Sequence, residues 1–542
     1  MRQVLRRKGR VLDVMRDDLA LLRRQLKGGD AKLLEQLAEV RRREASVVLV
    51  ASSKDRAASL ASLRREATRL ERDISGRSAA FREVTRAVTI ESVQQALPTD
   101  GALVEYVTYL PDIVDVPHGK LRYAAYVLLS SGAPRAVDLG DAGTIDELVQ
   151  KLRRMLADPR SLPDAVAREL DQRIMQPVRP LLGGKTRIFI SPEGALQLVP
   201  FAALRGEDHR PLVSRFSFTY LASGRDLLRP AVTTSSDRDV ALVGAPVFGK
   251  DGTTAKTREG PRSVYERMQF PPLPGTADEL GSLAKMLPAA KLVTGVDATE
   301  SAVKRIRAPR VLHIATHGFF LPVDSPVGGT TTDTVRSAAS PEAVSARAGP
   351  MLRSGLAFAG ANRRVDGADD GILTALEAST LDLSGTQLVV LSACETGLGE
   401  IRTGQGVHGL RRALTMAGAE TQVMSLWRVD DEATQELMRA YYRQLLAGRD
   451  RIEAMRRVQL ELLAEPRTRH PFYWASFIVS GQGGPVFAQS PEPTVPPVEA
   501  GPRGCGCRAA PASTSGWWAL IVATMIGLCR RRARLRQWEF LR

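Results

Sequence analysis

The spacing of hydrophobic residues along the chain changes near residue 90. Before that point, leucines recur at intervals of three and four with Arg and Asp between them, which is the periodicity of amphipathic helices. Gly28 and Gly29 interrupt the first helix, and Asp30 is suited to cap the next one. We therefore predict a helical region over 1–90, either a hairpin or a small bundle that leads into the next domain.

From about residue 95 to 485, short apolar runs alternate with helical patterns. The predicted strands are 102–109, 121–130, 187–191, 240–244, 291–294, 311–315, 388–392 and 421–426. The predicted helices are 145–156, 163–178, 277–287, 301–306, 407–416, 432–446 and 452–463. Strands that alternate with helices favour a parallel sheet covered on both faces, so we expect an α/β fold. The Gly-, Ser- and Thr-rich stretch 328–349 is expected to be a long loop.

The positive charge of the chain is concentrated at its two ends. The formal net charge is +16, but residues 1–90 hold 22 Lys and Arg against 12 Asp and Glu. Residues 501–542 hold 8 Arg against one Glu, so the region between the two ends is close to neutral. Aromatic residues make up 5% of the chain and are not interleaved with basic ones. A neutral centre without such a pattern argues against nucleic acid as a partner.

Two predicted strands each end in a reactive side chain. The run 311–315 is followed by Thr316, His317 and Gly318, and the run 388–392 is followed by Ala393 and Cys394. The carboxyl ends of neighbouring parallel strands are where chemistry usually lies in such sheets. There, an imidazole can lower the pKa of a thiol and return its proton to a leaving amine. The alternative is that Cys394 is a small buried residue and His317 only ends a strand.

Other polar residues near these strand ends have weaker claims to a catalytic role. Glycine at 318 would let its amide approach a developing oxyanion, with the amide of Cys394 as the second donor. His313 lies in the same predicted strand as His317, and we expect it to be structural. Glu395 is expected to cap the following helix, and His408 is a minor candidate. The sequence suggests no metal site and no cofactor.

Several motifs, taken in chain order, resemble the CHAT domain, a family of caspase-like cysteine peptidases related to separase. The motifs are VLHIATHG at 311–318, LVVLSACETG at 388–397 and VMSLWRVDD at 423–431, with SPEGALQLVPF at 191–201, GLAFAGAN at 355–362 and DGILTAL at 370–376. The resemblance spans about 95–485, which we divide into an N-terminal α/β part, 95–235, and a caspase-like part, 236–485.

The resemblance implies a protein substrate, His317 as general base and Cys394 as nucleophile of an acyl-enzyme mechanism. Relatives often carry tetratricopeptide repeats ahead of the domain, so 1–90 could be a remnant of such an array, although no 34-residue period is visible. The alternative is a catalytically silent CHAT module that binds protein partners, with the N-terminal helices as the contact surface.

Asp430 and Asp431 follow the predicted strand 421–426 and are candidates for a substrate pocket. Peptidases of this kind that cleave after basic residues place an acidic group in the primary pocket, because a buried cation needs a partner. The alternative is that one of the two caps the helix 432–446.

The C-terminal residues form a region of their own. A Pro-rich linker, 486–503, leads into 504–542, which holds Cys505, Cys507, an apolar segment 517–529 and an Arg cluster at 530–536. The order of these features resembles the myxobacterial sorting tail, which implies processing near Cys505 and Cys507 and a place on the cell surface. A simple membrane anchor and half of a metal site are the alternatives. We expect membrane association.

The first residues bear on the same expectation. Charged residues stand where a secretion signal needs an apolar segment, so the chain as written carries no signal. Either the protein stays in the cytoplasm, or the first residue is not the natural start.

Overall fold

A computed structural model describes residues 1–8, 29–49, 56–78, 88–111, 120–229, 239–249, 268–321, 350–363, 369–393, 396, 400–402 and 406–487. All of them belong to the first of two compact units, Met1–Ser490. The predicted loop 328–349, Cys394, Glu395 and the whole tail with Cys505 and Cys507 lie outside the described residues. Within the described ranges, no helix is both long enough and apolar enough to cross a membrane.

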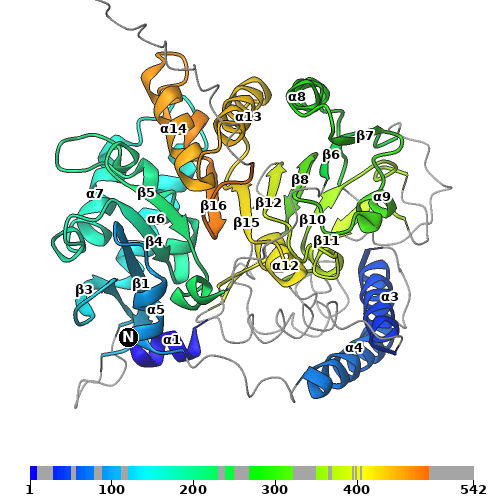
Figure 1. Cartoon of the computed structure of the whole chain (residues 1–542), viewed down its shortest axis with the longest axis horizontal. Helices are drawn as coiled ribbons and strands as arrows, with labels where there is room; N and C mark the ends of the chain where they lie inside the picture. Colours follow the sequence, from blue (N-terminus) through cyan, green and yellow to red (C-terminus); the bar gives the residue numbers. More distant parts are fainter. Residues whose placement is uncertain are drawn as a thin grey trace, which may run out of the picture. The chain divides into compact units, whose positions relative to one another are not determined.

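One 11-stranded sheet runs through the described unit, in the order β3-β2-β1-β4-β5-β16-β15-β12-β8-β6-β7 (Figure 1). Its strands are β1 (Gly101–Tyr109), β2 (Arg122–Leu129), β3 (Arg135–Asp141), β4 (Arg187–Ser191), β5 (Ser217–Tyr220), β6 (Val240–Pro246), β7 (Lys291–Gly295), β8 (Val311–Ala315), β12 (Leu388–Ser392), β15 (Thr421–Ser425) and β16 (Phe477–Gly481). Smaller sheets hold β9 (Gly318–Phe320), β10 (Ser354–Ala357) and β11 (Ile372–Thr374), and β13 (Glu400–Arg402) with β14 (Gly406–His408).

Helices flank this sheet and precede it. The α-helices are α1 (Arg2–Arg7), α3 (Gly29–Leu49), α4 (Arg56–Ser78), α5 (Ile90–Ala96), α6 (Ala142–Leu156), α7 (Asp164–Ile174), α8 (Pro274–Met286), α9 (Glu300–Arg305), α11 (Ala375–Ala378), α12 (Leu410–Ala417), α13 (Asp431–Leu446), α14 (Arg451–Ala464) and α15 (Pro471–Trp474). Short 3-10 turns are η2 (Arg179–Leu181), η3 (Gly194–Leu198), η4 (Phe201–Ala203), η5 (Leu212–Ser214) and η6 (Gly224–Leu228).

Most pairs of neighbouring strands in the large sheet are parallel. The strands β7, β6, β8, β12 and β15 form a continuous parallel series, and β1, β4 and β5 form a second one. The antiparallel pairs are β1–β2, β2–β3 and β15–β16. The two series meet because β16 pairs with β15 on one side and with β5 on the other. The expected α/β sheet is therefore present, and it is mixed where we expected it to be parallel.

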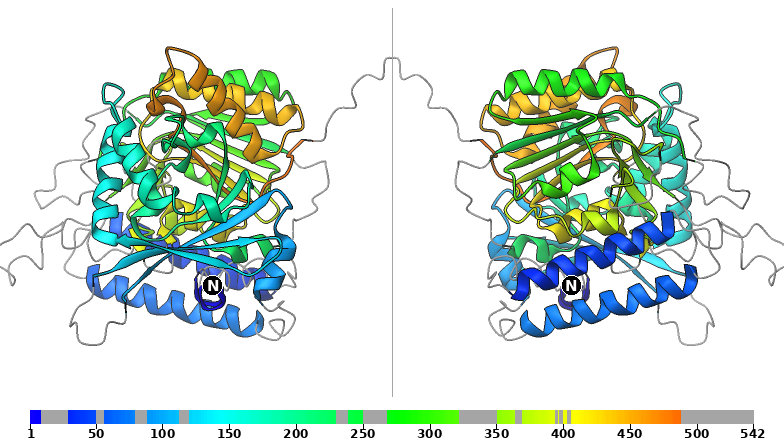
Figure 2. Two further views of the ribbon diagram at one scale, coloured as in Figure 1. Left: turned by 90° about the vertical axis from the view of Figure 1, so that its left-hand side faces the viewer. Right: turned by 90° about the vertical axis from the view of Figure 1, so that its right-hand side faces the viewer.

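The strands β8 and β12 are buried on both faces, which explains their continuous apolar sequences. Val311 and Ala315 of β8 belong to a core shared with α8, α13 and α14, whereas Leu312 and Ile314 belong to a second core shared with α9, α11 and α12. Helices lie on both sides of the sheet (Figure 2). This two-sided cover fixes the register of the strands that carry the candidate residues.

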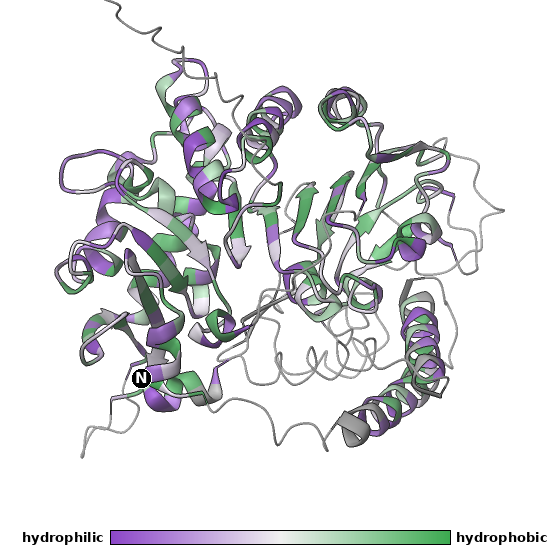
Figure 3. Ribbon diagram, viewed as in Figure 1, coloured by the Kyte–Doolittle hydropathy of each residue, from purple (hydrophilic) through white to green (hydrophobic). Residues whose placement is uncertain are grey.

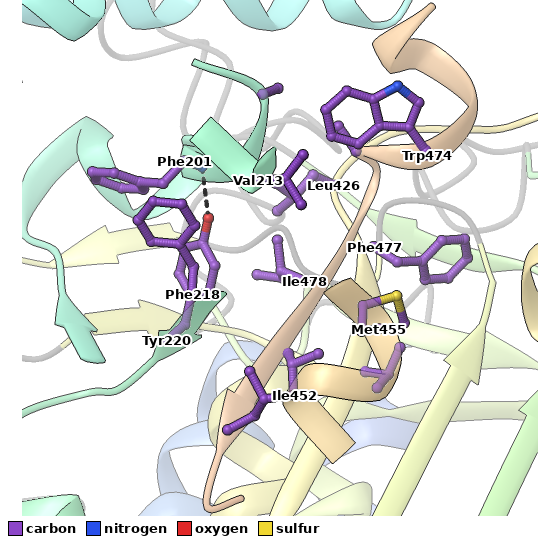
Figure 4. Close-up of a cluster of buried hydrophobic side chains, with 14 of the residues drawn as sticks. Phe201, Val213, Phe218, Tyr220, Leu426, Ile452, Met455, Trp474, Phe477 and Ile478 are labelled. Carbon is purple, nitrogen blue, oxygen red and sulfur yellow. Dashed lines mark hydrogen bonds between the residues drawn. The ribbon is translucent and has the colours of Figure 1, made fainter. Parts of the chain in front are cut away.

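A cluster of large side chains fills the junction between the two series of strands (Figure 4). Tyr220 belongs to β5 of the second series and Phe201 to the turn η4, and their rings are 6.1 Å apart. The Tyr220 hydroxyl accepts a hydrogen bond from the Phe201 amide at 2.9 Å. Met455 of α14, Trp474 of α15 and Phe477 of β16 belong to the same core. The two halves of the sheet therefore share one hydrophobic core.

The N-terminal region is helical, as predicted. The helices α3 and α4 pack against each other through Leu37, Val40, Leu63, Ala67 and Leu70, and their other faces are largely polar (Figure 3). Because α3 already begins at Gly29, Asp30 lies inside the helix and not at its cap, contrary to our expectation.

Three strands and the start of one helix also differ from the predictions. The strands β3, β5 and β16 were not expected, because they are short or carry polar and exposed residues. The helix predicted over 407–416 begins at Leu410, since residues 406–408 pair with β13 as β14.

Candidate active site

The candidate site lies at the carboxyl ends of β8 and β12. The two strands are adjacent and parallel, and Ala315 pairs with Ser392 at the last position of both. His317 follows β8 by two residues, and Cys394 follows β12 by two residues. Cys394 lies outside the described residues. The residue before it, Ala393, is held in place because its carbonyl accepts a hydrogen bond from the Ser425 hydroxyl at 2.7 Å.

The His317 ring is held in an apolar corner. It packs against Phe248 and Phe270, with ring centroids 5.3 and 5.7 Å away. Its Nε2 lies 2.8 Å from the carbonyl oxygen of Pro271. Because a carbonyl can only accept, Nε2 must carry a proton, and the lone pair of the neutral ring is then on Nδ1. The geometry leaves Nδ1 as the nitrogen that could take a proton.

The pKa of His317 is lowered from its ordinary value of 6.5. Burial is the main cause, and the positive charge of Arg428 acts in the same direction. The hydrogen bond to Pro271 and the charge of Asp431 oppose the shift. His317 is therefore a neutral imidazole at pH 7, which is the form that can act as a base.

The backbone after His317 is fixed by the small sheet. Gly318 is the first residue of β9 and pairs with Leu356 of β10. The amide of Ala357 donates to the carbonyl of His317 at 2.9 Å. The role of the Gly318 amide as an oxyanion donor stays a prediction, and so does that of the Cys394 amide, which lies outside the described residues.

A pocket opens beside the strand ends, on the side of the sheet covered by α8 and α13. Its empty space, part of it open to solvent, is about 430 Å³. We call it the strand-end pocket. Its lining includes Glu279, Thr316, Ser392, Ala393, Trp427 and Asp431. It therefore reaches from the residue before His317 to the residue before Cys394.

The two candidate aspartates lie in different environments. Asp430 is the N-cap of α13, and its side chain accepts hydrogen bonds from the amides of Glu432 and Ala433, each at 3.1 Å. Asp431 is the first residue of α13 and lines the strand-end pocket. A Cβ added at Gly275 would lie 2.8 Å from the Cβ of Asp431, so only glycine fits there without displacing this carboxylate.

A buried polar network lies under the same pocket, and sequence reasoning did not foresee it. Glu279 of α8 is 2% exposed, and its Oε2 accepts a hydrogen bond from Ser392 at 2.9 Å. Its Oε1 lies 2.9 Å from Nε2 of His313, a contact that lacks hydrogen-bond geometry. Nδ1 of His313 lies 3.1 Å from the hydroxyl of Tyr442. His313, fully buried, is thus part of a structural network, as expected.

The structure does not describe the side chains of the remaining candidates. The backbone of His408 lies in β14, but its side chain is outside the described residues, as is all of Glu395. Within the described ranges, no group of three or more His, Cys, Asp or Glu side chains could hold a metal ion.

Comparison with known proteins identifies the family. The CHAT domain model matches residues 164–482. The chain belongs to the CHAT domain family. The resemblance seen in the motifs is thus confirmed, whereas the resemblance of the tail to a sorting signal is untested.

The chain is also similar, at low identity, to a curated protein that carries tetratricopeptide repeats in its name. Tetratricopeptide repeat protein 28 of Homo sapiens is 25% identical over 348 residues, which cover 59% of this chain and 13% of that protein. The chain therefore spans only a small part of the length of this curated relative. This similarity supports the association with tetratricopeptide proteins.

Two solved structures of cysteine peptidases have weak overall similarity to the CHAT chain. The separase–securin complex of Saccharomyces cerevisiae matches with a TM-score of 0.41 and 8% identity, covering 80% of this chain and 34% of that chain. The Arg-specific cysteine proteinase gingipain R matches with a TM-score of 0.31 and 11% identity. The match covers 63% of this chain and 74% of the gingipain chain. We infer no activity from either similarity.

Proposed function

We propose that this CHAT protein is a cysteine endopeptidase in which His317 activates Cys394. The observation that carries the proposal is the register of β8 and β12, which pairs Ala315 with Ser392. Continued for two residues, that register would bring position 394 opposite His317. His317 suits the role of the base, because its Nε2 is bound to Pro271 and its Nδ1 has no hydrogen-bond partner among the described residues.

The reaction follows from these positions. Nδ1 of His317 takes the proton of the Cys394 thiol, and the thiolate attacks the peptide carbonyl. The imidazolium then protonates the leaving amine, which leaves an acyl-enzyme. A water molecule, deprotonated by His317, hydrolyses the acyl-enzyme and restores the thiol.

The test is cleavage of a peptide library, or of the chain itself, by Cys394→Ala and His317→Ala variants. Both should lose all measurable cleavage. The matched controls are Cys529→Ala, which removes another thiol, and His209→Asn, which changes an exposed histidine at a left-handed backbone position that Asn tolerates. Cleavage by the two site variants at the wild-type rate would show that the assignment is wrong.

We further propose that Asp431 selects substrates with Arg or Lys before the scissile bond. Asp431 is the acidic residue at the exposed rim of the strand-end pocket, next to the strand ends. Replacing it with Asn should remove most of the preference for basic residues, because the substrate cation would lose its partner. Asp430→Asn is the matched control, since Asn still caps a helix. A profile dominated by Leu, Met or Asp would contradict this specificity and leave the Cys–His pair untouched.

A catalytically silent module that binds proteins is the second candidate. The observation in its favour is the helical pair α3 and α4, whose outer faces are polar and whose packing includes an ion pair between Arg41 and Glu71. A thiol-directed peptidyl probe separates the two functions. Rapid labelling of Cys394 supports the peptidase. Labelling that is no faster than that of the same cysteine in the unfolded protein supports the module.

A further inference from the structure

A second pocket lies where the two halves of the sheet meet, and it shares no lining residue with the strand-end pocket. Its empty space is about 510 Å³, open solvent included. We call it the junction pocket. Its lining includes Gln197 of η3, Asp226 of η6, Arg411 and Thr415 of α12, Gln422 of β15 and Ser480 of β16. Elements of both halves therefore build it.

Arg411 supplies a buried cation with unused donors. The residue is 8% exposed, and its guanidinium lies over the Tyr220 ring at 5.6 Å. Its Nε donates to the hydroxyl of Ser480 at 3.1 Å, while that hydroxyl donates to the carbonyl of Tyr220 at 3.0 Å. Within the described part of the chain, nothing accepts a hydrogen bond from its two terminal nitrogens. Burial lowers the pKa of Arg411 only to about 10, so the side chain is charged at neutral pH.

Two buried glutamines add one donor and one acceptor to this cation. Gln197 and Gln422 are 4% and 3% exposed, and neither Nε2 of Gln197 nor Oε1 of Gln422 has a partner among the described residues. The orientation of Gln422 is determined by Thr415, whose hydroxyl donates to the Arg411 carbonyl at 3.0 Å. That hydroxyl can therefore only accept from Nε2 of Gln422, at 2.8 Å, which leaves Oε1 for another group.

The two carboxylates that line the pocket, those of Asp226 and Glu420, each lie beside another arginine, and Glu420 is 3.5 Å from Nη1 of Arg451. Asp226 accepts from the amide of Ala222 at 2.7 Å and pairs with Arg229 at 2.6 Å. Unpaired buried charge and unsatisfied buried polar atoms are costly, so a ligand that satisfies them gains affinity. The ligand must bring negative oxygens for Arg411 and Gln197 and one hydroxyl for Gln422.

We propose that the junction pocket binds a phosphate group that keeps one hydroxyl, either free hydrogen phosphate or a small phosphate monoester in its singly protonated, monoanionic form. The anionic oxygens would accept from Arg411 and Gln197, and the P–OH group would donate to Gln422. This site is independent of the proposed peptidase activity. Because its residues come from both halves, a bound phosphate would hold the two halves together.

The experiment is thermal unfolding of the whole chain with increasing inorganic phosphate, at constant ionic strength kept with NaCl. The wild type should show a saturable rise in Tm. Sulfate, which carries no proton at neutral pH, should give a smaller rise than phosphate. The variant Arg411→Met should lose the phosphate-dependent rise, whereas Arg439→Met, an exposed arginine on α13, should keep it. A small phosphate monoester in place of phosphate distinguishes the two ligand sources.

A second variant distinguishes loss of phosphate binding from loss of the fold. Gln422→Glu places a negative charge beside the proposed phosphate and should abolish the rise even if the protein stays fully folded. An equal rise in wild type and Arg411→Met, or the same rise with NaCl alone, would overturn the proposal and leave water as the content of the pocket. Isothermal titration of the wild type with phosphate, with no heat of binding, would do the same.

Discussion

The two nitrogens of His317 have different environments, and this difference decides its chemistry. Nε2 is committed to the Pro271 carbonyl, and the ring is sheltered by Phe248 and Phe270. Because the shelter disfavours the imidazolium, the folded protein binds the His317 proton less tightly than the unfolded chain does. As pH falls through 6.5, the unfolded chain is protonated first and stability decreases until the lower folded pKa is passed. Above 6.5 this group has no effect on stability.

Opening the apolar corner should raise the pKa of His317. The change Phe270→Ala removes one of the two rings that shield the imidazole, so the pKa should move up toward 6.5. The measurement is an NMR titration of the histidine ring signals. The control is Phe320→Ala, because Phe320 lies on β9, three residues after His317, and packs against Arg353. A pKa that is unchanged in the Phe270 variant would contradict burial as the cause.

The buried carboxylate of Glu279 should contribute strongly to stability. In Glu279→Leu, Nε2 of His313 and the hydroxyl of Ser392 would both lose the carboxylate beside them, while Nδ1 of His313 would keep Tyr442. We expect the free energy of unfolding to fall by about 3 kcal/mol, as when one member of a buried pair is removed. Urea unfolding measures this free energy, and the control is Glu461→Leu, because Glu461 is exposed. Equal values for the two variants would mean that the network contributes nothing.

At the scale of single elements, the N-terminus of α13 depends on Asp430. The change Asp430→Ala removes the acceptor for two amides and should cost about 1 kcal/mol of unfolding free energy. Asp430→Ser should restore most of it, because serine also caps helices. Chemical unfolding checks this. Glu432→Ala is the control, since that side chain is 78% exposed, and a loss as large as that of Asp430→Ala would contradict capping.

The sequence predicts the central strands well and the joints of the sheet poorly. The strands β8 and β12 are buried on both faces, so an unbroken apolar run identifies them. The strand β3 is partly exposed at the sheet edge, and β5 has only four residues, so neither shows a clear period. The same limit applies to the site. His317 could be found from its strand, but its contact with Pro271 joins residues 46 positions apart, and no local pattern reports such a contact.

At the scale of the whole molecule, the proposal concerns the C-terminal tail and its association with a membrane. The apolar segment 517–529, followed by the Arg cluster at 530–536, suits a bilayer with arginines at one interface. We propose that the full chain sediments with membranes and that a version ending at Pro502 does not. A chain with Val522→Asp and Ile526→Asp should behave like the short version, because charges oppose insertion. Full-length protein that stays in the supernatant of its native host without detergent would contradict the anchor.

The position of β16 has a consequence for the order of folding. It is the last strand of the chain among the described residues, yet it lies in the middle of the large sheet, between β5 and β15. During synthesis, β5 and β15 each keep one unpaired edge until residues 477–481 have left the ribosome. Unpaired edges invite association with other chains, so the nascent protein is vulnerable from the synthesis of β5 until β16 has emerged. A chain that ended just before residue 477 would lack the strand that joins β5 to β15, so each of these two strands would keep an open edge.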